Sequence, residues 1–221
     1  MGCSAGPSVA SAPVLYLDAG NSRSYPGSGT TWTDLSGRGN TGTLVNGPTY
    51  SSANGGSAVD GFIVFDGSND YVGLTAGLLS GTGDFTVSQW IQHQSGVGGT
   101  TFANYPSGNL QMFFGTYYIG LYLANSSAYA DAAVHYTGNW VMFTCLRSGT
   151  VTQVYKNTTL IKTGSSSSTI GGTTASFRMG TNTSNGEQYT GKISTTNVYS
   201  RALSASEVLQ NFSALRGRYG L

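Results

Sequence analysis

Carboxylates are the residues of this chain that could most directly do chemistry, because glycoside hydrolysis needs two of them at a set separation. The sequence holds nine Asp and Glu residues, and no predicted strand carries them as an alternating array. Asp66 and Asp70 flank a short turn and Asp84 precedes a strand, which are positions typical of Asx turns and hydrogen-bond clamps. A serine triad would lack the Gly-x-Ser-x-Gly elbow. We therefore predict that the protein is not an enzyme.

A metal ion would find few ligands in this sequence. Calcium takes six to eight oxygen ligands, often including several carboxylates. Asp18, Asp66 or Asp84 could supply some of them together with loop carbonyls. His93 and His135 are far apart in the sequence and have no spaced partner, so we interpret them as surface or structural histidines. The sequence predicts no cofactor and leaves a weak calcium site open.

Aromatic side chains are the third group of residues with a possible chemical role. Sugar rings stack on aromatic faces, and neighbouring polar groups supply oriented hydrogen bonds. A cluster of tyrosines in the middle of the chain gives the candidate glycan-binding residues: Tyr105, Tyr117, Tyr118, Tyr122 and Tyr129. The alternative is purely structural, because alternating aromatics in a hairpin commonly lie half in the core and half on the sheet surface.

The composition is typical of many short strands joined by tight turns. Charged residues are 9% of the chain, against about 25% in an average soluble domain, and 33 glycines help to fill the gap. The net charge is +1 without a basic cluster, which argues against nucleic acid and anionic membranes as partners. No apolar run approaches the roughly 20 residues of a membrane span. A chain of 221 residues suits one large all-β domain.

Several elements can be placed from hydrophobic periodicity. Three hairpins are predicted from paired strand signals: 62–66 with 70–74, 110–114 with 117–123, and 140–147 with 151–156. Residues 85–92 alternate strictly, with Phe85, Val87 and Ile91 on one face and Trp90 on the other. Residues 163–174 are predicted to form a polar loop. All five prolines lie before residue 107, and the later strands therefore keep every backbone donor.

One helix is predicted near the C-terminus, after a strand ending at Tyr199. Ser204 and Glu207 form a capping box, since the serine hydroxyl can cap the helix while the carboxylate reaches back. The apolar residues that follow have helical spacing: Val208, Leu209, Phe212 and Leu215. Gly217 is predicted to end the helix. The whole pattern predicts a two-sheet antiparallel sandwich over residues 13–221, preceded by a flexible arm over residues 1–12.

The sequence resembles laminin G-like domains of the concanavalin A-like superfamily. The resemblance is carried by LYLDAGNSRSYPGSGTTWTDLSGRGNTGTLVNGPTY, VFDGSNDYV, DFTVSQWI, the Trp140 segment and VYSRALSASEVLQNFSALRGRYGL, and it covers about residues 14–221. It implies a jelly roll of two curved antiparallel sheets. More narrowly, residues 16–27 and 201–221 resemble the versions found in virion proteins of tailed phages, notably phages of aquatic bacteria.

Two departures from the family pattern bear on the site. Many relatives have an acidic pair where this chain has Ser194 and Thr195, so carboxylates that could support a calcium site are missing here. Relatives also tend to have an Asn-Gly turn where this chain reads Lys156-Asn157-Thr158, which we expect to change only a hairpin turn.

Two functions are open from the sequence. The first is a non-enzymatic phage structural protein, a capsid decoration or accessory protein on the virion surface, with capsid or tail proteins as partners and a homo-oligomer as a further option. The alternative is a glycan-binding adhesion module, either a phage host-attachment domain or a bacterial surface lectin, with host glycans as ligands. A lectin should show a surface where aromatic and polar side chains converge, whereas a decoration protein should show an interface for another protein.

Overall fold

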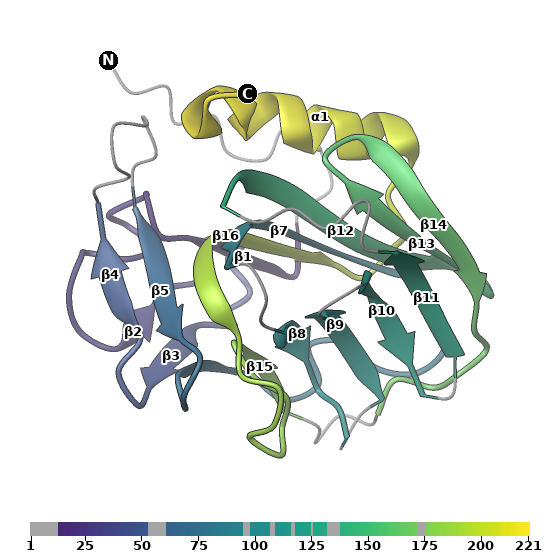
Figure 1. Cartoon of the computed structure of the whole chain (residues 1–221), viewed down its shortest axis with the longest axis horizontal. Coiled ribbons are helices and arrows are strands. Elements are labelled where there is room, and N and C mark those ends of the chain that lie inside the picture. Colours follow the sequence, from purple (N-terminus) through teal and green to yellow (C-terminus); the bar gives the residue numbers. More distant parts are fainter. Residues whose placement is uncertain are drawn as a thin grey trace.

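The computed structural model describes residues 13–52, 61–94, 98–106, 109–115, 118–124, 126–131, 138–171 and 176–221, with only the backbone for 126–131. In this part of the chain two antiparallel sheets lie face to face, and one helix lies across the outer side of one of them (Figure 1). The predicted all-β jelly-roll sandwich with a single short C-terminal helix is thereby confirmed. The predicted arm, residues 1–12, falls outside the described residues. Where the chain is described, no helix is both long and apolar enough to cross a membrane.

The described strands and helices follow one another along the chain in this order. They are β1 (Leu15–Asp18), β2 (Thr31–Trp32), β3 (Gly42–Val45), β4 (Thr49–Ser51), β5 (Phe62–Asp66), β6 (Tyr71–Leu74), β7 (Phe85–His93), β8 (Gly99–Ala103), β9 (Leu110–Phe114), β10 (Tyr118–Leu123), β11 (Ser126–Asp131), β12 (Trp140–Ser148), β13 (Val151–Lys156), β14 (Thr159–Ser165), β15 (Phe177–Met179), β16 (Thr190–Tyr199), the helix α1 (Ala205–Leu215) and the 3-10 helix η2 (Arg216–Tyr219).

Sheet A has the strand order β14-β13-β12-β7-β16-β5-β4, and β1 pairs with the second half of β16. Strands β5 and β1 share the same edge of β16, where β5 pairs up to Ile193 and β1 pairs from Thr195. The register between β16 and β7 shifts at this point, which is the mark of a β-bulge. The bulge lets one long strand serve two partners in succession.

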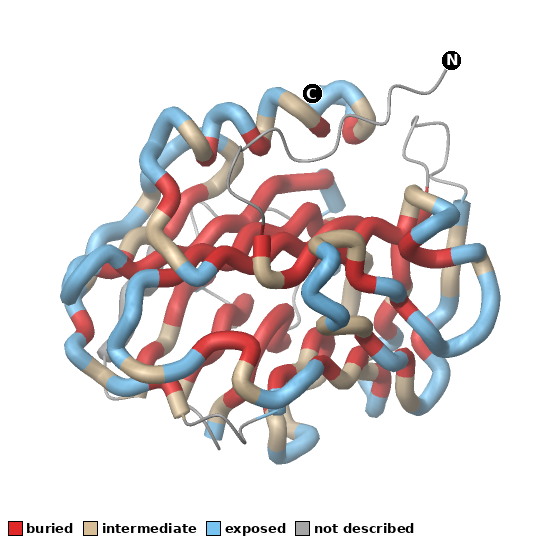
Figure 2. The backbone as a smooth tube through the Cα atoms, turned by 180° about the vertical axis from the view of Figure 1, so that it is seen from behind, coloured by how far each residue is buried: buried red, intermediate tan, exposed pale blue. Residues whose placement is uncertain are grey.

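Sheet B has the order β11-β10-β9-β8-β15-β6-β3-β2. A continuous core lies between the two sheets and contains inward-facing residues from both, such as Phe143 and Ile91 from sheet A with Phe102 and Phe177 from sheet B. Figure 2 shows these buried segments as two stacked layers. Two of the predicted hairpins, β9–β10 and β12–β13, are confirmed by their pairing.

The first predicted hairpin is wrong. Strand β5 pairs with β4 and β16 in sheet A, whereas β6 pairs with β3 and β15 in sheet B. The turn after Asp66 therefore carries the chain from one sheet to the other. Both strands put an apolar row into the core, Phe65 from one side and Val72 from the other, and period-two patterns cannot tell such a crossover from a hairpin. The predicted loop over 163–174 is also shortened, because β14 runs to Ser165 and pairs with β13.

A second cluster of buried residues lies between sheet A and the helix. Trp90 stacks on Tyr219 of η2 with ring centroids 3.9 Å apart and on Phe212 of α1 at 5.5 Å. Trp140 lies 5.1 Å from the same Tyr219 ring. The predicted opposite face of β7 is thus confirmed: Trp90 belongs to the helix cluster, and Ile91 belongs to the core between the sheets.

The capping box at the start of α1 is confirmed. The backbone N–H of Glu207 donates to the Ser204 hydroxyl, and the Glu207 carboxylate accepts from the Ser204 N–H at 2.8 Å. The apolar face needs correction at Leu209, which is 50% exposed, while Val208 and Leu215 are buried as predicted. Leu209 lies about 100° around the helix from Val208 and so points away from the sheet.

The end of the helical region also differs from the prediction. The chain continues through Gly217 as the 3-10 helix η2, and Gly220, at φ 74°, is the residue that leaves the helical conformation. This extension brings Arg218 against Asp18 of β1, with 2.8 Å between Nη1 and Oδ1. The two ends of the described chain are therefore joined by an ion pair across 200 positions.

Acid should weaken the attachment of the helix. The hydrogen-bonded Arg201 guanidinium, together with the Ser204 N–H, lowers the pKa of Glu207 from its ordinary 4.5 to about 2. A carboxyl group whose pKa is lower in the folded state stabilises the protein at pH values above its unfolded-state pKa. That contribution is lost as the pH falls from about 4.5 toward 2. Glu207→Gln should remove this part of the pH dependence, because the Gln amide does not ionise in this range. The helix should keep its cap, because Gln also completes a capping box. Melting temperatures between pH 7 and pH 2 would show it, and equally steep acid loss in both proteins would contradict it.

Candidate functional site

The outer face of sheet B is built by simple alternation along its strands. In β10, Ile119, Leu121 and Leu123 point into the core, so Tyr118 and Tyr122 point outward. In β9, the core residues are Leu110, Met112 and Phe114, and the outward residues are Gln111 and Phe113. Tyr118 is 40% exposed, whereas Gln111 is only 4% exposed and forms part of the floor.

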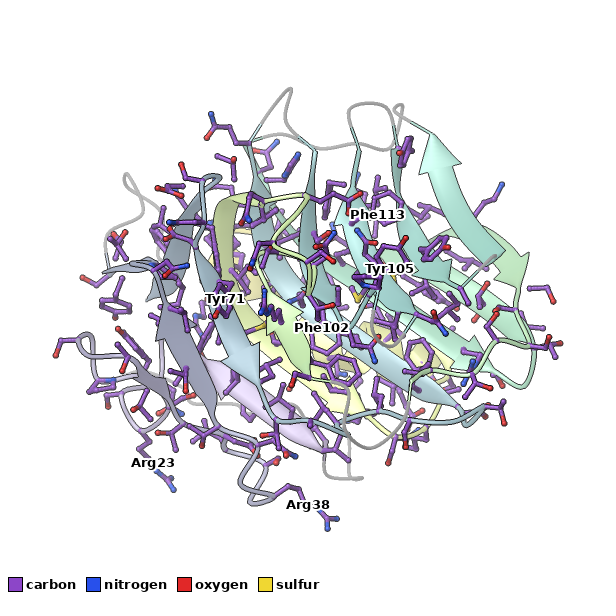
Figure 3. The ribbon with its side chains drawn as sticks, turned by 90° about the horizontal axis from the view of Figure 1, so that it is seen from below. Arg23, Arg38, Tyr71, Phe102, Tyr105 and Phe113 are labelled. Carbon is purple, nitrogen blue, oxygen red and sulfur yellow. The ribbon has the colours of Figure 1, made fainter. Side chains whose placement is uncertain are left out.

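Aromatic rings meet edge to face on this surface. The rings of Phe113 and Tyr118 are 5.3 Å apart, and those of Tyr105 and Tyr122 are 5.2 Å apart, both with an interplanar angle of 80°. We call these four residues, with Gln111, the tyrosine face. Figure 3 looks onto the outer side of sheet B, where Tyr105 and Phe113 lie on the same part of the sheet.

A carboxylate completes the tyrosine face. Glu187, from the loop after β15, accepts a hydrogen bond from the Thr100 hydroxyl at 3.1 Å and another from the Gln111 amide. The same Gln111 nitrogen donates to the Thr100 hydroxyl at 2.7 Å. The side chain of Glu187, an exposed residue, is thereby fixed above a buried polar pair.

The loop over residues 181–188 is itself internally braced. The Asn182 side chain accepts hydrogen bonds from the N–H groups of Ser184 and Gly186. Thr183 donates to the Tyr105 carbonyl through both its N–H and its hydroxyl. Glu187 is held at φ 56°, a left-handed conformation that is uncommon for residues other than glycine. The loop therefore positions Glu187 and anchors the Tyr105 end of the face.

Three of the five predicted glycan-binding tyrosines come together on this face: Tyr105, Tyr118 and Tyr122. Tyr117 lies outside the described residues. Only the backbone of Tyr129, in β11, is described, and it pairs with Gly120 of β10. A ligand role for all five stays a prediction.

The structure adds residues that the sequence reasoning missed. Alternation in β9 could have identified Gln111 and Phe113, since both fall between core residues. Glu187 carried no such signal, because it is 76 positions away from Gln111.

The carboxylates considered for calcium are far apart and already engaged. Asp18 pairs with Arg218, Asp66 accepts from the Ser68 N–H in an Asx turn, and Asp84 accepts from the Gly149 N–H. The interpretation of Asp66 and Asp84 as turn and clamp residues is confirmed. Within the described ranges, no group of three or more His, Cys, Asp or Glu residues could hold a metal ion.

The departure at Ser194 also has a structural role. Its hydroxyl donates to the Gly61 carbonyl at 2.8 Å and accepts from Arg218 at 3.2 Å, and both Ser194 and Thr195 are buried. Ser194 therefore lies beneath the C-terminal 3-10 helix.

Two hollows in the described part of the structure lie elsewhere. One of about 310 Å³ is bordered by Val64, Gln92 and Lys192 on sheet A. The other, of about 190 Å³, is bordered by Leu78, Asp84 and Ile170. Neither is lined by residues of the tyrosine face, which lies outside both hollows.

Calcium should not affect stability. Because Asp18, Asp66 and Asp84 each satisfy a separate local contact, melting temperatures with excess calcium and with a chelator should agree within about 1 °C, since only a ligand of the native state shifts them. Added salt also screens the Arg201–Glu207 ion pair, and this effect is unrelated to calcium binding. Glu207→Gln lacks that ion pair, so it is measured in parallel as the control. A chelator-induced drop of several degrees in the parent protein alone would reveal a site that these contacts do not account for.

Comparisons with known proteins agree with the fold. Domain 4 of AbnA, an extracellular arabinanase from Geobacillus stearothermophilus solved with arabinotriose, superposes with a TM-score of 0.69 at 19% identity, covering 90% of this chain and 97% of that domain. The botulinum neurotoxin serotype G binding domain gives 0.71 at 14%, covering 91% and 50%. The serotype D domain, solved with N-acetylneuraminic acid, gives 0.66 at 13%, also covering 91% and 50%. This chain thus spans about half of the toxin binding domains.

Family membership rests on the sequence comparison. No curated protein matches the chain. The Laminin_G_3 family model, described as the concanavalin A-like lectin/glucanases superfamily, matches residues 66–209, which is more than half of the chain. The chain therefore belongs to this laminin G-like family of concanavalin A-like domains.

Proposed function

We propose that this chain is a non-catalytic carbohydrate-binding domain and that the tyrosine face is its binding surface. The observation that carries the proposal is the placement of one exposed and two partly exposed tyrosines on the same sheet face as a fixed carboxylate. Tyr118 and Tyr122 project from one strand, and Glu187 is held by Thr100 and by Gln111, the residue opposite Tyr122 in the sheet.

The chemistry of the face suits a sugar. Apolar faces of sugar rings stack on aromatic side chains, and hydroxyl groups need acceptors and donors at fixed positions. Glu187 supplies acceptors, and its orientation is set before any ligand arrives because Thr100 and Gln111 already bind it. Pre-orientation lowers the entropy lost on binding.

Binding fits the face better than hydrolysis does. Among the described side chains, Glu187 is the carboxylate that contacts the tyrosine face, whereas glycoside hydrolysis uses two. The similarity to binding domains, one solved with arabinotriose and another with N-acetylneuraminic acid, supports the same proposal. An adhesion role, with host glycans as ligands, follows from it.

Tyr122→Ala should weaken glycan binding by about tenfold or more. The substitution removes a ring whose stacking on the sugar should contribute about 1.4 kcal/mol or more of binding free energy. The ligand would first be found on a glycan array that includes arabino-oligosaccharides and sialylated glycans, and affinity would then be measured by calorimetry. Tyr122→Phe keeps the ring and is the matched control, with nearly the parent affinity expected.

Leu209→Ala is the second control, because Leu209 is exposed on the helix over the opposite sheet. Melting temperatures of all three variants would separate lost binding from lost folding. Parent affinity in a folded Tyr122→Ala protein would overturn the assignment of the face, and an array without any bound glycan would overturn the function.

We propose, on the resemblance of residues 16–27 and 201–221 alone, that the domain works on the surface of a phage particle as a decoration or accessory protein. A glycan-binding surface and a virion location are compatible, because many copies on a particle multiply a weak contact. Mass spectrometry of particles purified from the producing host should detect the chain at a fixed copy number relative to the capsid protein. Its absence from intact particles would contradict the location without affecting the binding proposal.

A further inference from the structure

A cation lies on the same outer face of sheet B as the tyrosine face. Arg178 is the middle residue of β15, and its neighbours Phe177 and Met179 point into the core. Its side chain therefore points outward. In the backbone register it lies opposite Gly73 on one side and Ala103 on the other.

The Arg178 guanidinium is held in place by three contacts. It lies 4.4 Å from the centre of the Tyr71 ring, and its Nη1 donates to Asn185 Oδ1 at 2.5 Å and to the Asn182 carbonyl at 3.4 Å. These hydrogen bonds use one of three nitrogens, while a guanidinium carries five N–H donors. The described residues give Arg178 no carboxylate partner. Its remaining donors form the planar fork that matches a carboxylate.

Space is available beside this fork. A Cβ added to Gly73 would have only ordinary contacts, with the Tyr71 ring at 3.7 Å and the Thr43 carbonyl at 3.9 Å. Directly opposed residues in a sheet have side chains about 5 Å apart. A Cβ would fit there without displacing a neighbour, so the missing side chain at Gly73 leaves a small opening, bordered by the Tyr71 ring, opposite Arg178.

The backbone register connects this cation to the tyrosine face. Arg178 pairs with Ala103, Ala103 with Gln111, and Gln111 with Tyr122. Three strand spacings separate Arg178 from Tyr122, or about 14 Å. One oligosaccharide lying across the strands could contact both. Figure 3 shows Tyr71 toward one side of the sheet and Tyr105 and Phe113 toward the other.

The charges on this face are therefore ordered along one line. A cation lies at the Tyr71 end, and the carboxylate of Glu187 lies near Gln111. Glu187 would repel a ligand that is anionic along its whole length, while Arg178 would attract a single acidic group. Resting on the proposed function, we infer that the domain binds an oligosaccharide with one carboxylate-bearing sugar, a uronic or sialic acid, at Arg178 and neutral sugars over the tyrosines.

Matched pairs of sugars test this inference. Lactose would be compared with sialyllactose, and xylotriose with xylotriose carrying one glucuronic acid, while trigalacturonate serves as the uniformly anionic probe. We expect at least one acidic member to bind about tenfold or more tightly than its neutral counterpart, and trigalacturonate to bind no better than the neutral sugars. This acid preference should shrink at high salt.

Arg178→Gln should abolish the preference for the acidic sugar and leave binding of the neutral sugar within about twofold. Gly73→Val keeps the charge but fills the opening, so it should reduce the preference in the same way. Arg38→Gln is the matched control, because Arg38 is exposed on a turn away from this face (Figure 3) and its loss should change nothing.

Each outcome has a separate meaning. Equal affinity for acidic and neutral sugars in the parent protein, or a preference that survives in folded Arg178→Gln, would overturn the acidic subsite. A sulfated sugar that binds as tightly as its carboxylate analogue would overturn the choice of carboxylate. If neutral binding still depends on Tyr122 in these cases, the proposed function stands; if none of the probes or array glycans binds, both fail.

Discussion

Burial of sheet A on both faces is the constraint on which the rest of this structure depends. Strands β7, β12 and β16 pack against the core on one side and against the helix on the other, and β16 is buried from Ile193 to Tyr199. A sheet in that position needs a cover on its outer side. The capping box, the rings of Phe212 and Tyr219 and the Asp18–Arg218 ion pair all hold that cover in place. No helix of the described residues covers the outer side of sheet B, and the proposed binding surface lies there.

Local patterns were sufficient where the physics is local. The capping box at Ser204 and Glu207 lies within four residues, and strict alternation in β7 placed Trp90 and Ile91 on opposite faces. The crossover after Asp66 could not be predicted, since strands that enter different sheets both show period two. Leu209 was wrongly assigned to the buried face of the helix. The spacing alone did not show on which side of Val208 the buried stripe continues.

The candidate site was only half visible in the sequence. Tyr118 and Tyr122 follow from alternation in one strand, but their polar partners come from elsewhere in the chain. Glu187 reaches Gln111 and Thr100 through a loop whose shape depends on Asn182 and on left-handed residues. Arg178 can be recognised as a candidate ligand-binding residue only from its neighbours, the ring of Tyr71 and the small opening at Gly73. Such contacts join residues about 70 to 110 positions apart and depend on the strand order, which no single-sequence pattern encodes.

The division of the three tryptophans between the two buried clusters gives the protein built-in optical probes. Trp32 lies in the core between the sheets, whereas Trp90 and Trp140 lie beneath the helix and near the ring of Tyr219. Stacked rings give strong near-ultraviolet circular dichroism, which is lost when the fixed packing is lost. With Trp32 replaced, the remaining fluorescence would follow detachment of the helix, and with Trp32 alone it would follow opening of the sandwich. The order in which the two layers separate can thus be read from emission, without any added label.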